Sequence, residues 1–168
     1  SETCRAIPRL GSGGSPLAAL NLTKNRSREY YVINAFVRSV KMKIFIASDI
    51  HGSEHYCKIM AEKYREESAD KLLLLGDLLY HGPRNDLPLG YNPKGVILIL
   101  NSLKNEIICV RGNCDTEVDQ MVLDFPIMAE YAIIYDGNKT IYATHGHKFN
   151  PQNPPMLKSG DILLNGHT

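Results

Sequence analysis

The chain has 168 residues, 43% of them hydrophobic, and a formal net charge of +1. This length allows one domain with a sizeable core, and the near-neutral charge gives no reason to expect a general nucleic-acid or membrane partner. No apolar stretch approaches the roughly 20 residues needed to span a bilayer.

The first 41 residues differ from the rest in charge. They carry seven Lys/Arg and two Glu, whereas residues 42–168 carry twelve Lys/Arg and sixteen Asp/Glu. Because Gly11–Pro16 is typical of a flexible linker, we interpret 1–41 as a basic, linker-like segment outside the domain, with Met42 as a candidate start. An organellar transit peptide, or an added helix over Glu29–Val40 with helically spaced apolar residues, are the alternatives.

From Met42 onward, short apolar runs alternate with helical patterns. The spacing predicts that Tyr56, Ile59, Met60 and Tyr64 line the buried face of the first helix. The βαβ order predicts an α/β fold. The expected strands are Lys43–Ala47, Lys71–Leu75 and Ile107–Arg111. The expected helices run from the cap Ser53 through about Ser68, over Lys94–Leu103 and over Thr116–Leu123. An irregular loop is expected over 80–93, a hairpin of Met128–Tyr135 with Thr140–Thr144, and a last apolar run over Ile162–Leu164.

Polar side chains follow the ends of these strands. Because the carboxyl ends of strands in open α/β sheets border a common crevice, we expect these side chains to converge. Two Asp, one Asn and three His suit a pair of hard to borderline divalent ions such as Mn²⁺, rather than a thiolate zinc site. The segments are Asp49-Ile50-His51, Gly76-Asp77, Gly112-Asn113-Cys114-Asp115, Thr144-His145-Gly146-His147 and Gly166-His167-Thr168.

In this order the segments resemble the motifs of the calcineurin-like metallophosphoesterases. Ala47–Ser53, His81–Asn85 and Val110–Asp115 are also similar to the small bacterial phosphodiesterases of the YfcE type. The resemblance covers 42–168 and implies a four-layer αββα sandwich of two mixed sheets, with metals at one edge. The family's last motif, G-H-x-H, stops here at Thr168, so we expect a domain incomplete at its C-terminus and a poor enzyme.

The resemblance also implies a site and a reaction. The expected function is hydrolysis of phosphodiesters by a metal-bound hydroxide at a two-metal centre, with Mn²⁺ as the expected ion. Asp77, Asn113 and Arg84 are the candidate catalytic residues, with Arg84 as a phosphate clamp and Arg111 either a second clamp or the partner of a structural carboxylate. His55 and His147 are not expected as ligands. The implied ligands are Asp49, His51 and Asp77 for the first metal, and Asp77, Asn113, His145 and His167 for the second.

Several points stay open at this level. The leaving-group acid is a metal-bound water, His81 or Cys114. Asp115 is expected to cap the following turn, with orientation of that acid as the alternative. A non-catalytic scaffold on the same fold, or a regulator acting on cyclic or other nucleotides, are alternative functions. We expect a small phosphodiester or nucleotide-like substrate and no long nucleic acid. Four Cys without a C-x-x-C pair favour a reducing compartment, hence the cytoplasm.

Overall fold

The computed structural model describes residues 20–25, 30–35, 42–137 and 139–167, and the chain divides into two compact units between Lys41 and Met42. In the first unit, β1 (Leu20–Asn25) pairs with β2 (Tyr30–Ala35) in antiparallel fashion. The helix alternative is therefore wrong over residues 30–35, because consecutive aromatic and β-branched residues favour a strand. The linker-like run lies outside the described residues.

In the second unit, three parallel strands form the first sheet, in the order β3 (Ile44–Ala47), β4 (Lys71–Leu74), β5 (Ile107–Cys109). The register pairs the last residues of all three strands. The segments that follow them therefore leave the sheet at one edge, where the sequence places its polar motifs.

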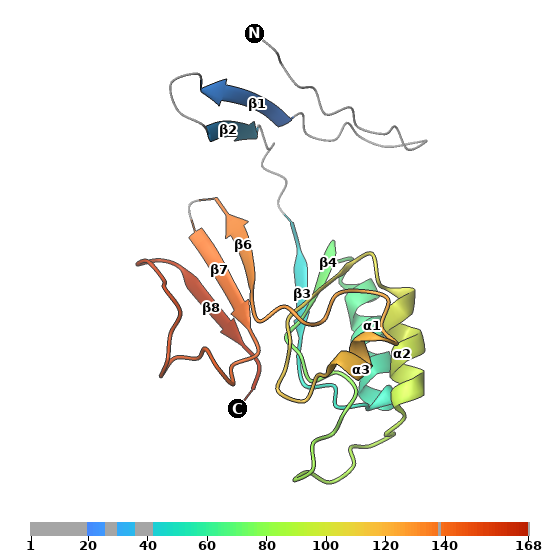
Figure 1. Ribbon diagram of the computed structural model, residues 1–168. Helices are drawn as coiled ribbons and strands as arrows, with labels where there is room; N and C mark the ends of the chain where they lie inside the picture. Colours follow the sequence, from blue (N-terminus) through green and yellow to red (C-terminus); the bar gives the residue numbers. More distant parts are fainter. Residues whose placement is uncertain (1–19, 26–29, 36–41, 138, 168) are drawn as a thin grey trace, which may run out of the picture. The chain divides into compact units, whose positions relative to one another are not determined.

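The second sheet is mixed. Strand β6 (Ala132–Asp136) runs antiparallel to β7 (Lys139–Thr144), which runs parallel to β8 (Ile162–Asn165). Thr144 lies opposite Asn165, so β7 and β8 also end together. Figure 1 shows the two sheets side by side, with the helices beyond the first sheet.

Three helices cover the outer face of the first sheet: α1 (Glu54–Glu66), α2 (Pro93–Ser102) and the short α3 (Glu117–Gln120). Leu72 and Leu74 of β4 belong to the core beneath these helices, whereas Leu73 and Leu75 belong to the core shared with the second sheet. A run of four leucines is needed because both faces of this sheet are buried.

Helix α1 begins after the N-cap Ser53, whose hydroxyl accepts the N–H of Tyr56. Its buried residues are Cys57, Met60, Ala61 and Tyr64. The expectation for Tyr56 and Ile59 is wrong, since they are 54% and 41% exposed. The small side chains of Cys57 and Ala61 instead lie in the core.

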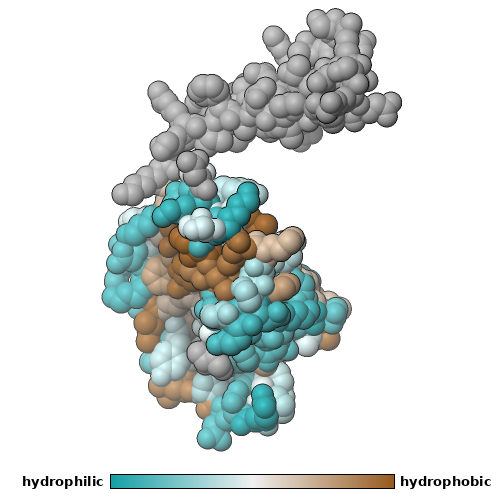
Figure 2. Space-filling view, turned by 90° about the vertical axis from the view of Figure 1, so that its left-hand side faces the viewer, coloured by the Kyte–Doolittle hydropathy of each residue, from teal (hydrophilic) through white to brown (hydrophobic). Residues whose placement is uncertain are grey.

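The described part of 42–168 thus contains three layers, namely helices, parallel sheet and mixed sheet. Figure 2 shows apolar residues gathered on the side where the second sheet lies, and there Ile133 and Tyr135 are 44% and 76% exposed. Among the helices described, none is long and apolar enough to cross a membrane.

Candidate metal centre

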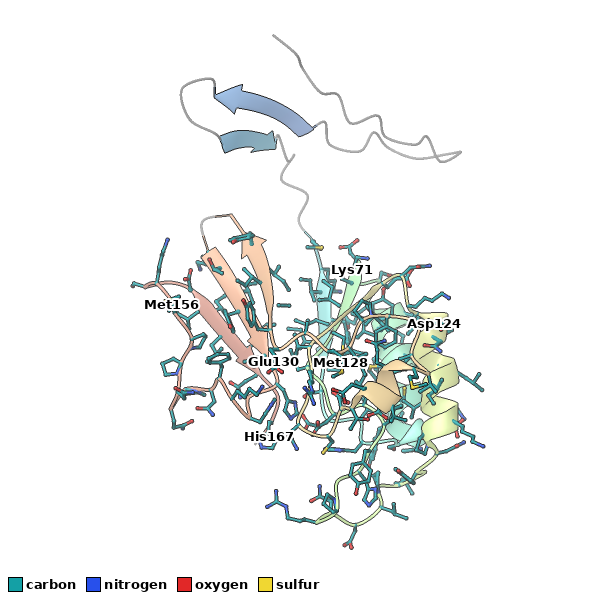
Figure 3. The ribbon with its side chains drawn as sticks, in the orientation of Figure 1. Lys71, Asp124, Met128, Glu130, Met156 and His167 are labelled. Carbon is teal, nitrogen blue, oxygen red and sulfur yellow. The ribbon has the colours of Figure 1, made fainter. Side chains whose placement is uncertain are left out.

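The candidate site lies where the strands of both sheets end. Figure 3 places His167 just beyond β8, at the opposite edge from Lys71, which begins β4. Three of the motif residues have left-handed backbones, with φ of 56° at Asp49, 49° at His51 and 57° at Asp77. Such conformations are costly for residues other than glycine and cluster at functional sites, so the fold holds these side chains against a local preference.

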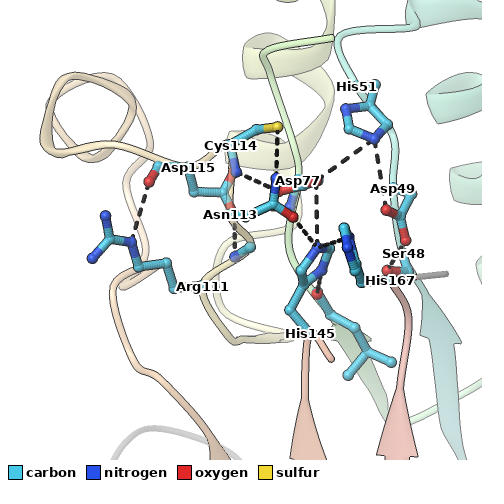
Figure 4. A network of polar contacts seen from close by, with 12 residues as sticks. Ser48, Asp49, His51, Asp77, Arg111, Asn113, Cys114, Asp115, His145 and His167 are labelled. Carbon is cyan, nitrogen blue, oxygen red and sulfur yellow. Dashed lines mark hydrogen bonds and ion pairs between the residues drawn. The ribbon is translucent and has the colours of Figure 1, made fainter. Parts of the chain in front are cut away.

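Asp77 occupies the middle of the site. Its side chain is almost fully buried, and one carboxylate oxygen, Oδ1, accepts the N–H of Cys114 at 2.8 Å. The other oxygen, Oδ2, lies 3.6 Å from His51 Nε2 and 3.4 Å from His145 Nε2. A single oxygen thus faces two imidazole nitrogens that come from different sheets (Figure 4), which is the arrangement expected of a bridging ligand.

His51 and His145 are oriented in the same way. His51 Nδ1 lies 2.7 Å from the carbonyl oxygen of Tyr80, and His145 Nδ1 lies 2.7 Å from that of Leu75. A carbonyl only accepts, so Nδ1 carries the proton in each ring and Nε2 presents a lone pair to Asp77 in the neutral form. Metal-binding histidines are commonly held by such a partner on the second nitrogen.

The donor set fits a cation. His145 Nε2 faces the amide oxygen of Asn113 at 2.9 Å and His167 Nδ1 at 3.2 Å, in addition to Asp77. In the neutral ring the Nε2 lone pair faces the acceptor oxygens of Asn113 and Asp77, an arrangement that a proton or a metal ion between them would stabilise. Single ligand atoms of Asp49, Asp77, His145 and His167 all lie within 4.8 Å of one another.

The pKa values of the central pair respond to this crowding. Burial acts to raise the pKa of Asp77, but His145, the Cys114 N–H and His51 outweigh it, so the pKa is lowered. Burial acts to lower the pKa of His145, but the Asp77 carboxylate outweighs it, so the pKa is raised. The two groups therefore stabilise one another as an ion pair when no metal is bound, and a divalent ion would displace the proton.

Asp115 supports the site by accepting hydrogen bonds from its backbone, a role that the sequence did not predict. Its buried carboxylate accepts the N–H groups of Asp77, Leu78 and Gly112, at 2.8, 2.9 and 2.7 Å. Burial raises the pKa of Asp115, and these three N–H groups offset that only in part. The expectation that it caps the next turn is wrong, because Thr116 is the N-cap of α3.

Two further contacts explain residue choices in the motifs. A Cβ on Gly112 would overlap Asp77 Oδ1, so only glycine lets these two segments come together. At the other side, the hydroxyl of Ser48 donates to Asp49 Oδ2. Asp49 is more exposed than Asp77, with about a third of its side chain accessible.

Cys114 borders the same carboxylate. Its sulfur forms a second possible donor group with His51 and Asp77. Burial and the Asp77 carboxylate raise the pKa of this thiol to about 12, so it is neutral without a cation.

Arg84, Arg111 and the histidines outside the donor set form no described hydrogen bond or ion pair with the donors. Arg111 pairs with Glu130 at 3.7 Å and donates from Nε to the carbonyl of Asp115 at 3.2 Å, as the alternative of a structural carboxylate predicts. Arg84 lies exposed in the loop, and no described contact joins it to the donors. His55 is exposed on α1, and His147 lies with its ring 5.4 Å from that of His145.

Comparison with known proteins adds to this geometry. The profile of the calcineurin-like phosphoesterase superfamily domain matches residues 42–168. Phosphodiesterase YfcE of Escherichia coli strain K12 is 47% identical over 127 residues, which cover 76% of this chain and 69% of that protein. The protein of the same name from strain O157:H7 gives the same values.

A solved structure of Yfce, described as a phosphoesterase from E. coli, superimposes with a TM-score of 0.70 at 47% identity. The match covers 71% of this chain and 66% of that one. The chain therefore spans about two thirds of the length of these relatives.

Proposed function

This chain belongs to the calcineurin-like phosphoesterase superfamily, and we propose that it hydrolyses small phosphodiesters with the help of two divalent metal ions. One observation carries the proposal: a single Asp77 oxygen lies 3.6 Å from His51 Nε2 and 3.4 Å from His145 Nε2. Two histidines that share one carboxylate oxygen are suited to two adjacent ions. The donors also divide into two groups that share Asp77, one with Asp49, His145 and His167 and the other with His51 and Cys114.

We propose that the first ion binds Asp49, His51 and Asp77, and the second Asp77, Asn113, His145 and His167. Bound divalent ions supply Lewis acidity, which activates water near neutral pH and neutralises the phosphoryl oxygens. Mn²⁺ is the proposed metal, because oxygen and imidazole donors together suit a hard to borderline ion.

The residues around the donors prepare them for this role. The Tyr80 and Leu75 carbonyls fix which nitrogen of His51 and His145 is free, and Asp115 fixes the backbone on either side of the bridge. Asn113 contributes an oxygen without adding negative charge. Little reorganisation is then required when the ions and the phosphate bind.

Arg84 is the proposed phosphate contact from the loop. A guanidinium matches two phosphate oxygens at once, and the exposed position of Arg84 leaves it free to do so. Substitution by Lys keeps the charge but removes the bidentate geometry. We expect Arg84→Lys to raise KM for a diester more than it lowers kcat.

The substrate is proposed to be a small phosphodiester or nucleotide-like compound, since residues 42–168 carry more acidic than basic side chains and long nucleic acids bind basic surfaces. The donors that are present, from Asp49 to His167, favour an enzyme over the scaffold alternative. A cytoplasmic location is supported by Cys57, Cys109 and Cys114, which are free thiols.

The direct test is hydrolysis of bis(4-nitrophenyl) phosphate by the 168-residue chain with Mn²⁺, Mg²⁺, Zn²⁺ or Ca²⁺, and after chelation. We expect low activity with Mn²⁺, loss with chelator, and weak calorimetric binding of two Mn²⁺ per chain. Undiminished activity after chelation, with metal content verified as nil, would reject the mechanism.

A further inference from the structure

The segment Tyr80–Gly82 forms one rim of the candidate metal centre. The Tyr80 carbonyl accepts from His51, and a Cβ placed on Gly82 would lie 3.6 Å from the sulfur of Cys114. The backbone of His81 is therefore held between two residues that border Asp77. Asn85 adds a further constraint by donating to the His81 carbonyl at 2.9 Å.

The His81 ring is held by its aromatic neighbours. It lies edge-to-face against Tyr80 and Tyr91, with ring centroids 4.9 and 5.3 Å away. Its Nδ1 is enclosed and, like Nδ1 of His147, has no hydrogen-bond partner among the described residues. A buried polar atom without a partner carries a free-energy cost, and in native structures it requires an explanation.

Two imidazoles of the donor set, those of His51 and His145, are not available as proton donors to a substrate. In both His51 and His145, Nδ1 donates to a backbone carbonyl and Nε2 faces Asp77. His81 is the imidazole on this rim that is outside the donor set. Its ring is only partly exposed and Nδ1 is enclosed. Nε2 is therefore the nitrogen available to a ligand. An imidazolium can donate a proton near neutral pH.

Resting on the phosphodiesterase activity proposed above, we propose that His81 is the catalytic acid that protonates the departing ester oxygen. An oxygen from water forms a bond to phosphorus, and the bond between phosphorus and the ester oxygen breaks. The electron pair stays on that oxygen, which takes the proton from His81 Nε2 and leaves as the alcohol. The neutral imidazole regains a proton from the one that water releases, so the net reaction gives monoester and alcohol.

Leaving groups of different basicity test this role in the full 168-residue chain. A 4-nitrophenolate leaves without protonation, whereas a phenolate benefits from an acid. We expect His81→Gln to lower kcat/KM for methyl phenyl phosphate roughly a hundredfold, within the range of general acid catalysis. We expect only a severalfold loss for methyl 4-nitrophenyl phosphate.

The matched control is His55→Gln, which removes an exposed imidazole from α1 and should change neither substrate. Mn²⁺ affinity of His81→Gln, measured by calorimetry, should equal that of the parent, which separates an acid from a residue that positions the metal donors. Equal losses on both diesters would overturn the proposal, as would a leaving-group-dependent loss in His147→Gln but not in His81→Gln. A parent that cleaves neither diester with Mn²⁺ would reject the proposed function itself and, with it, the role of His81.

Discussion

The inner and outer halves of the candidate metal centre are built differently. The inner half, Asp77 and His145, is buried. The N–H of Cys114 bonds Asp77, and the carbonyl of Leu75 bonds His145. The outer half, Asp49 and His51, has about a third and a fifth of its side chains exposed. We infer that the inner half sets the position of the centre and is costly to disturb, whereas the outer half tunes metal affinity at the rim.

The largest effect should come from changing Asp77, the residue proposed to bridge the two ions. Asp77→Asn keeps the size of the side chain but weakens attraction to both ions, so we expect a loss of diester hydrolysis on the order of a hundredfold or more. Calorimetry should also show that fewer than two Mn²⁺ bind. His147→Ala, outside the donor set, should be much milder, and equal rates for Asp77→Asn and the parent would contradict the bridging role.

The second largest effect should come from changing Asp115, which accepts hydrogen bonds from the backbone around Asp77. Asp115→Ala leaves three buried N–H groups without an acceptor, and a loss of about 3 kcal/mol of unfolding free energy or more is expected from such groups. Urea denaturation of the metal-free chain measures it. Asp115→Asn retains one acceptor oxygen and should lose less. If both variants were as stable as the parent, these hydrogen bonds would contribute little.

The outer half should respond in affinity rather than in stability. Ser48→Ala removes the hydroxyl that donates to Asp49, and we expect Mn²⁺ affinity to fall roughly tenfold, as for other residues that orient a ligand. The melting temperature of the metal-free chain should stay near that of the parent. Ser102→Ala, on α2, removes a hydroxyl that bonds a helix carbonyl and serves as the control. Unchanged affinity in Ser48→Ala would contradict this division of roles.

The smallest effect should be the pH dependence of the metal-free chain. The pKa of His145 is raised in the folded state, so its contribution is complete below the ordinary histidine pKa and is lost as pH rises through the raised pKa. The pKa of Asp77 is lowered, so its contribution is present above the ordinary aspartate pKa and is lost as pH falls through the lowered value.

We therefore expect the melting temperature, measured with chelator, to fall as pH rises past neutral. His145→Gln should flatten that part of the curve and leave the acid side, where other carboxylates titrate, largely as it was. An identical alkaline slope in parent and variant would show that His145 does not carry the effect.

The family, the fold class and most elements of 42–168 follow from the amino-acid pattern. Runs such as Leu72–Leu75 can only be buried on two sides, and glycines followed by polar residues end the strands in a recognisable order. The comparisons confirm the calcineurin-like phosphoesterase family and its fold. The spacing of apolar residues predicted the buried face of α1 less well, because apolar residues lie on more than one face of that helix. Tyr56 and Ile59 are exposed, and Cys57 and Ala61 are buried instead.

The support of the site, in contrast, depends on contacts between residues far apart in the sequence. The contacts from Asp115 to Asp77 and from His145 to Leu75 join residues 38 and 70 positions apart. They depend on the register of parallel strands and on left-handed backbones at Asp49, His51 and Asp77. Local sequence fixes which atoms can donate or accept, but the distance between them is set by the packing of two sheets, which no short segment encodes.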